Sequence, residues 1–163
     1  MPFLQHLCQV LYDSRIGTAI RESDLAFPII ESVHVLAITL LAGTIAVLDL
    51  RMLGVILRKI SVRRIASAVL PVTWAGFGVL FISGFLLFWS EAAKNYTNRA
   101  FRVKLVLLVL AGLNPLLFHT GVYRRAEEWE LAEVAPWRAR IAAIASLALW
   151  SGIIVAGRFI AYF

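Results

Sequence analysis

The chain has 163 residues, of which 61% are hydrophobic and 16% charged, and its mean hydropathy of +0.82 lies outside the usual range of soluble proteins. Its formal net charge is +6, but the basic residues cluster at the ends of apolar segments, where Lys and Arg set the orientation of membrane proteins. Composition and charge therefore exclude a soluble catalytic domain and a nucleic-acid-binding protein, and they make the lipid bilayer the expected surroundings.

Residues 3–20 predict a short helix that lies in the membrane interface. Apolar Phe3, Leu7, Val10 and Leu11 recur at helical spacing, with polar residues between them. The segment has no basic start, so it does not read as a cleaved signal peptide, and the N-terminus is expected to be retained. The single cysteine, Cys8, excludes an internal disulfide.

Four apolar segments follow, over residues 27–50, 65–89, 101–123 and 141–161. Each is long enough to cross about 30 Å of hydrocarbon at a rise of about 1.5 Å per residue. Together they use almost the whole chain. The sequence predicts an all-α integral membrane four-helix bundle that forms one transmembrane domain, 1–163.

Basic residues predict the topology. Nine lie in the connections after the first and third segments, and seven lie on the opposite side, or five if Lys104 and Arg158 are inside the membrane. By the positive-inside rule, these two connections face the cytoplasm and both termini face outward.

Two short repeats indicate a duplicated helix pair. Arg64-Ile65-Ala66 leads to Trp74-Ala75-Gly76, and the same pattern returns 76 residues later, from Arg140 to Gly152. Leu41-Ala42-Gly43 returns as Leu110-Ala111-Gly112 at an offset of 69. Either a helix pair has been duplicated, or apolar helices resemble each other by chance. Small residues permit close helix packing, which is the role expected for five glycines: Gly43, Gly76, Gly78, Gly112 and Gly152.

Ionisable residues inside a bilayer are costly and usually functional, and four of them reach a similar depth near the outer ends of three segments. They are Glu31, His34, Lys104 and Arg158. Glu31 and His34 share one helix face. This layer predicts haem b near the outer face, with His34 as axial ligand and Lys104 as second ligand or neighbouring cation. Arg158, with Arg99 or Arg102, would neutralise the propionates. The alternatives are a structural hydrogen bond of His34, to Glu31 or across helices, and a Lys104 ammonium that reaches the headgroups.

A second polar layer lies near the cytoplasmic side and contains Asp49, Arg51 and His119. By the rise per residue, His34 lies about 7 Å outside the midplane and His119 about 10 Å inside it, so the two histidines cannot ligate one haem iron between straight helices. His119 could pair with Asp49 as a proton relay or quinone-binding element, ligate a second haem, or cap polar groups in the bundle core.

The residues around these positions also carry a resemblance. Residues 27–35 and 48–54, together with Phe101-Arg102-Val103-Lys104-Leu105, Leu113-Asn114 and His119, resemble an uncharacterised family of small bacterial four-helix membrane proteins. That resemblance implies the bacterial inner membrane and no particular function. His34 and Lys104 are more remotely similar to positions in HemJ-type protoporphyrinogen oxidases, which implies a haem ligand at His34, and in CopD-type copper-resistance proteins.

The leading hypothesis is a b-type haem protein that transfers electrons between a quinone or membrane redox partner and an outer-face partner. If it is an enzyme, it is a haem-dependent membrane oxidoreductase. The runner-up is a non-redox permease or accessory subunit in which Glu31, His34 and Lys104 form a polar network. A homodimer is compatible with either.

Overall fold

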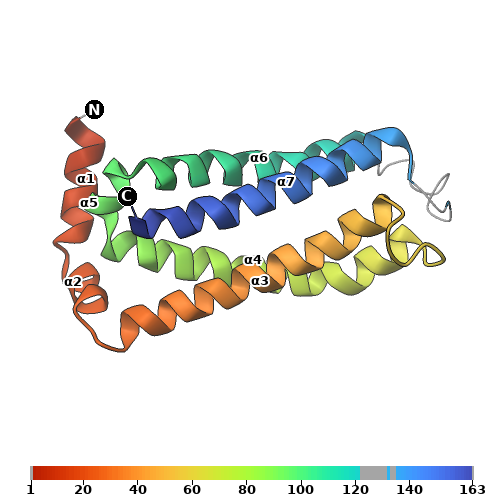
Figure 1. Ribbon diagram of the computed structural model, residues 1–163. Coiled ribbons are helices and arrows are strands. Elements are labelled where there is room, and N and C mark those ends of the chain that lie inside the picture. The colour runs from red at the N-terminus through yellow and green to blue at the C-terminus, as the bar shows by residue number, and fades with distance from the viewer. Residues whose placement is uncertain (1, 122–131, 133–134, 163) are drawn as a thin grey trace.

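The computed structural model describes residues 2–121, 132 and 135–162 (Figure 1). Within this part of the chain every regular element is helical, which confirms the all-α fold. The elements are α1 (Pro2–Tyr12), α2 (Arg15–Arg21), α3 (Ala26–Met52), α4 (Val62–Ser90), α5 (Ala92–Thr97), α6 (Arg99–Gly121), α7 (Trp137–Phe159) and a 3-10 turn (Ile160–Tyr162).

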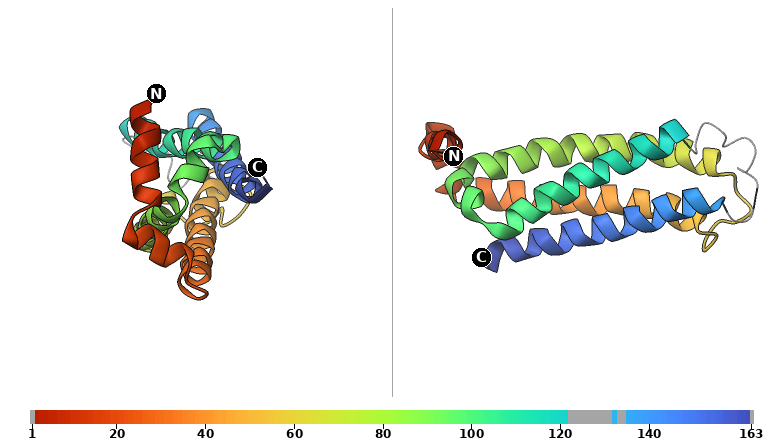
Figure 2. Two further views of the ribbon diagram at one scale, coloured as in Figure 1. Left: turned by 90° about the vertical axis from the view of Figure 1, so that its left-hand side faces the viewer. Right: turned by 90° about the horizontal axis from the view of Figure 1, so that it is seen from above.

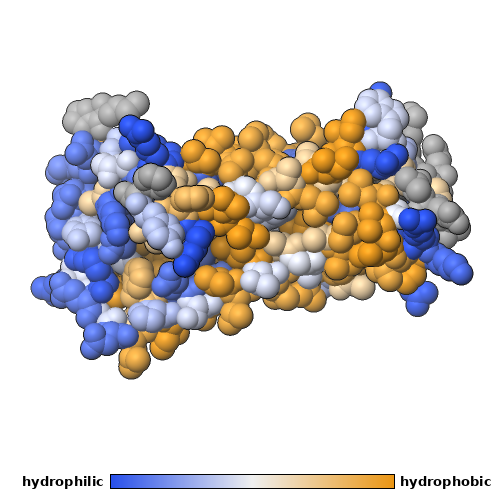
Figure 3. All heavy atoms as spheres, viewed as in Figure 1, coloured by the Kyte–Doolittle hydropathy of each residue, from blue (hydrophilic) through white to orange (hydrophobic). Residues whose placement is uncertain are grey.

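Four of these helices, α3, α4, α6 and α7, are long and apolar enough to cross a membrane. They begin and end within a few residues of the predicted segments where the structure describes them. Figure 3 shows that apolar residues form a broad belt around the middle of the molecule, with hydrophilic residues at both ends. A belt of this kind is typical of a helical bundle embedded in a bilayer.

The long helices are arranged as two antiparallel pairs. Helix α3 packs against α4, α6 packs against α7, and the two pairs meet mainly through α3 and α7. Both termini lie at one end of the bundle, together with α1, α2 and α5 (Figures 1 and 2). We call this the terminal end, and the opposite end, where α3 leads to α4 and α6 to α7, the loop end. Four spans place both termini on the same side of a membrane.

The N-terminal segment differs from its prediction as one helix over 3–20. It forms two helices, because the Ser14 side chain accepts a hydrogen bond from the Gly17 amide and caps a new helix. Helix α1 lies across the terminal end (Figure 2) and packs against α5. The Trp89 indole donates to Ser14 Oγ at 2.9 Å, and Arg21 donates to the Ser90 carbonyl at 2.9 Å. These bonds fasten the N-terminal helices to the end of α4.

The packing role predicted for five glycines is correct for two of them. A Cβ at Gly76 would lie 3.7 Å from the Leu41 amide nitrogen of α3, and a Cβ at Gly152 would lie 3.2 Å from Leu107 of α6. The remaining three have no other segment within 4 Å of such an atom, so each faces away from the helix contacts: Gly43, Gly78 and Gly112. Gly76 and Gly152 occupy related positions of the sequence repeat, and each faces the partner helix of its own pair.

The loop end is closed by a small core and one buried cation. Its core contains Met52, Val62, Ala135, Ala139 and Ala143. Arg51 has no exposed surface, and it donates from Nε to the Ile60 carbonyl at 2.8 Å and from Nη2 to the Ala132 carbonyl at 3.0 Å. Ile60 and Ala132 belong to the two different connections. Arg51 therefore joins both connections to the end of α3.

Candidate functional site

His34 of α3 points at α4 in the half of the bundle nearer the terminal end. Its Nδ1 lies 3.0 Å from Ser83 Oγ. The ring also lies over Gly84, because a Cβ at that position would be 2.9 Å from His34 Cε1. Ser83 thus orients the imidazole and Gly84 makes room for it. Neither residue was singled out by the sequence, because finding them requires knowing how α3 and α4 are aligned.

The hydrogen bonds of Ser83 assign the tautomer of His34. The Ser83 hydroxyl donates to the Val79 carbonyl at 2.6 Å, as expected for a serine inside a helix. A hydroxyl has one hydrogen, so the contact with His34 requires Nδ1–H to donate to Ser83 Oγ. In the neutral ring Nε2 then carries a lone pair. The Leu80 carbonyl of α4 also accepts a hydrogen bond from the imidazole.

Lys104 of α6 occupies the corresponding place in the other helix pair. Its Nζ would lie 3.5 Å from a Cβ at Gly157 of α7, so its side chain runs along that glycine. The residue is only partly exposed, and its charge acts on His34 across the bundle. Among the described residues the ammonium has no hydrogen-bond acceptor and no carboxylate partner.

The two helix pairs therefore repeat one arrangement. In each pair the first helix carries a nitrogenous side chain, and the second helix carries the glycine over which that side chain lies. His34 and Lys104 are 70 residues apart, close to the repeat offset of 69. His34 and Lys104 thus lie on different helix pairs, each beside a glycine of its partner helix, which is the central feature of the site.

The other predicted residues lie elsewhere. Glu31 is exposed, with no described bond to His34. Arg158 is exposed and its guanidinium lies 5.9 Å from the Tyr162 ring centroid. Arg99 is exposed, and Arg102 donates to the Tyr96 carbonyl. None of these three arginines joins the described contacts of His34 and Lys104.

His119 lies in α6, toward the loop end. It is 15 residues beyond Lys104, or about 22 Å along the helix axis. The predicted roles of its side chain concern atoms outside the described part of the chain. The backbone position agrees with two polar layers, and it keeps His119 far from His34.

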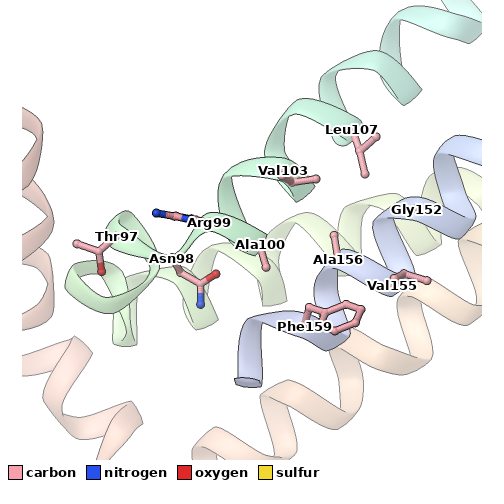
Figure 4. A pocket seen from close by; sticks show the side chains of 10 residues that line it. All are labelled: Thr97, Asn98, Arg99, Ala100, Val103, Leu107, Gly152, Val155, Ala156 and Phe159. Carbon is pink, nitrogen blue, oxygen red and sulfur yellow. The ribbon is translucent and has the colours of Figure 1, made fainter. Parts of the chain in front are cut away.

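A groove between α6 and α7 lies near the terminal end (Figure 4). Its volume is about 810 Å³, and most of its lining is apolar, with Thr97, Asn98 and Arg99 at one end and Leu107 and Gly152 at the other. Neither His34 nor Lys104 lines it. The groove is therefore separate from the candidate site.

The Ser83 contact gives a test of the site that needs no cofactor. In ¹⁵N-labelled protein, His34 should show a protonated Nδ1 and an unprotonated Nε2. Ser83→Ala should weaken this preference up to about tenfold, because a hydrogen bond contributes about 0.5–1.5 kcal/mol. The signals are few, since the chain has three histidines. Equal tautomers in wild type, or no change in Ser83→Ala, would contradict the assignment.

Among the described residues no group of three or more His, Cys, Asp or Glu side chains could hold a metal ion.

Comparisons with known proteins extend the description of the chain to its family. No curated protein and no solved structure matches it, and these comparisons show no similarity to the HemJ-type or CopD-type proteins. Residues 18–163 match a family described as a family of unknown function, DUF6644. The match covers α3 to α7 and leaves α1 outside it. The chain belongs to the DUF6644 family.

Proposed function

We propose that the protein is a membrane b-type haem protein in electron transfer, with His34 as an axial ligand. The observation that carries the proposal is the state of the His34 imidazole. Ser83 and the Leu80 carbonyl hold the imidazole on the α4 side, which fixes the ring orientation, and protonation of Nδ1 leaves the Nε2 lone pair for a ligand. In histidine ligands of metals and haems, one ring nitrogen typically binds the metal and the other donates a hydrogen bond to a group that orients the ring. A bound haem would supply a one-electron carrier.

Lys104 supports the proposal by its charge. An ammonium group inside the apolar belt is costly unless a negative or accepting group lies beside it. The described residues offer none. A haem propionate would meet this need, and a neutral Lys104 amine would instead be a second axial ligand. In both cases Lys104 acts on the same ligand as His34, from the opposite helix pair.

The two helix pairs pack mainly through α3 and α7. His34 projects from α3 toward α4, and Lys104 of α6 lies against Gly157 of α7, so each group contacts the partner helix of its own pair. A haem that uses both groups would have to bridge the two pairs. A single haem held by both His34 and His119 does not fit, because of their separation along the bundle.

We further propose that the protein lies in the bacterial inner membrane with both termini in the periplasm. The nine basic residues of the two loop-end connections support this orientation. In this orientation His34 lies nearer the outer face. Electrons would pass between a quinone or membrane partner and a partner on the periplasmic side.

An absorption spectrum of the purified protein tests the proposal. Protein made in cells with ample haem should show a Soret band that shifts on reduction, and His34→Ala should remove it. His6→Ala is the matched control, because His6 is exposed on α1 and should leave the spectrum unchanged. Folding of each variant is checked by circular dichroism. A colourless folded wild-type protein, or an unchanged spectrum in His34→Ala, would contradict the proposal and favour a permease or accessory subunit.

A further inference from the structure

A second buried group lies far from His34, toward the loop end of α3. Asp49 is only 4% exposed, and its Oδ2 has no hydrogen-bond partner. The Ser146 hydroxyl of α7 lies beside the carboxyl. Ser146 is itself 7% exposed, so both side chains are enclosed between α3 and α7. A buried carboxyl oxygen without a partner is rare in a folded protein and calls for a chemical explanation.

Among the residues that the structure describes, the cations near Asp49 do not supply a counter-ion. Arg51, the nearest cation along α3, directs two of its donors to carbonyl groups of the connections. No ion pair joins Asp49 to any described residue. The other cations near the loop ends of the two helices packed against α3 are exposed: Arg63 and Arg64 on α4, and Arg138 and Arg140 on α7. His119 of α6 is also at the loop end, with its side chain outside the described part.

Without a counter-ion, the charged form of Asp49 is strongly disfavoured. An isolated carboxylate costs many kcal/mol in an apolar interior, and such a group normally takes up a proton instead. The neutral acid needs only ordinary hydrogen bonds, and a nearby hydroxyl can accept from the carboxyl O–H. The Ser146 hydroxyl can donate to the carboxylate or accept from the acid, so the burial of Asp49 without a counter-ion, rather than this contact, favours the protonated form.

We propose that Asp49 and Ser146 form a proton-binding site, in which Asp49 is a carboxylic acid at neutral pH. A proton from water at the loop end forms an O–H bond on the carboxylate, and the same bond breaks when the proton returns to water. No other reactant is needed. Asp49 lies within the last turn of α3, so the path to solvent at that end is short. The site is 15 residues from His34, about 22 Å along α3.

Infrared spectroscopy of the full-length protein in lipid bilayers tests the site. The wild-type protein at neutral pH should show the carbonyl band of a protonated carboxyl, which lies above the bands of a carboxylate. Transfer to D₂O should shift this band to lower frequency within minutes, because the proton exchanges with water. Asp49→Asn should lose the band. Glu31→Gln, at an exposed carboxyl in the same helix, should keep it.

Isotope labelling keeps the test decisive if Asp49→Asn does not fold. The chain has three aspartates, and the other two, Asp13 and Asp24, are exposed. Labelling the aspartate carboxyl carbons with ¹³C should therefore shift the band in wild-type protein. Ser146→Ala should move it by removing the neighbouring hydroxyl. The proposal is overturned if the band is missing, is insensitive to the label, persists in folded Asp49→Asn, or does not respond to D₂O. None of these readouts depends on haem.

Discussion

Arg51→Ala is expected to lower the free energy of unfolding by about 3 kcal/mol. Arg51 is fully buried and bonds to the Ile60 and Ala132 carbonyls, which lie in two different connections. Alanine would remove these two charge-assisted bonds, which contribute about 1.5–3 kcal/mol each. Unfolding of the purified protein in mixed micelles, followed by circular dichroism, measures the change.

Two further variants show whether the loss comes from the bonds of Arg51 or from any change of basic charge. Arg58→Ala, in the exposed α3–α4 connection, should stay within about 0.5 kcal/mol of wild type. Arg51→Lys keeps the charge but not the planar fork of donors, so it should fall between wild type and Arg51→Ala. Equal stability of Arg51→Ala and Arg58→Ala would show that the described bonds do not hold the loop end together.

Gly84→Ala is expected to reduce haem affinity about 10- to 100-fold without unfolding the protein. The added Cβ would lie 2.9 Å from His34 Cε1, so the imidazole must move away from Ser83. Changes to the groups that orient a metal ligand typically have effects of this size. Alanine also favours a helix over glycine by up to about 1 kcal/mol, so the unfolding free energy should stay level or rise. Haem titration and the unfolding measurement separate the two effects.

Gly78→Ala provides the matched control for this variant. It lies on the same helix, and a Cβ there meets no other segment within 4 Å. This variant should gain the same helical stability and keep the wild-type affinity. If both variants bind haem equally well, His34 is not confined by Gly84 in the way described. The position of the imidazole can be followed independently by its ¹⁵N signals, which should change in Gly84→Ala alone.

The long helices could be predicted from the sequence because the bilayer sets their length and apolar character. Local signals then decide how helices end. Gly54, with φ of 72°, follows the end of α3, where glycine adopts the left-handed conformation at little cost. The break between α1 and α2 also has a local signal, Ser14 as an N-cap, which the apolar spacing of residues 3–20 concealed. The short helix α5 has no apolar pattern of its own and was not predicted.

The sequence predicted the two central residues of the candidate site but not the residues around them. His34 and Lys104 stand out because ionisable groups are rare in apolar segments. Their surroundings depend on the alignment of different helices, which periodicity within one helix does not determine. Ser83, Gly84 and Gly157 look like ordinary residues of apolar helices until that alignment is known.

The burial of the charged residues at the loop end also could not be predicted from the sequence. Asp49 and Arg51 were expected to mark the end of a span, and they do lie in the last turn of α3. Both are buried, however, because Asp49 lies against Ser146 of α7 and Arg51 bonds to the Ile60 and Ala132 carbonyls. When each apolar segment is considered alone, a charged residue at its end is expected to be exposed.

The placement of His34 and Lys104 in separate helix pairs means that each can be changed on its own. His34 is confined by α4 and Lys104 lies against α7, so a substitution in one pair leaves the contacts of the other group in place. The two glycines are not equivalent under the repeat, because Gly84 and Gly157 are 73 residues apart, whereas the repeat that relates α4 to α7 has an offset of 76. A duplicated hairpin would therefore have acquired the two arrangements separately, one in each half.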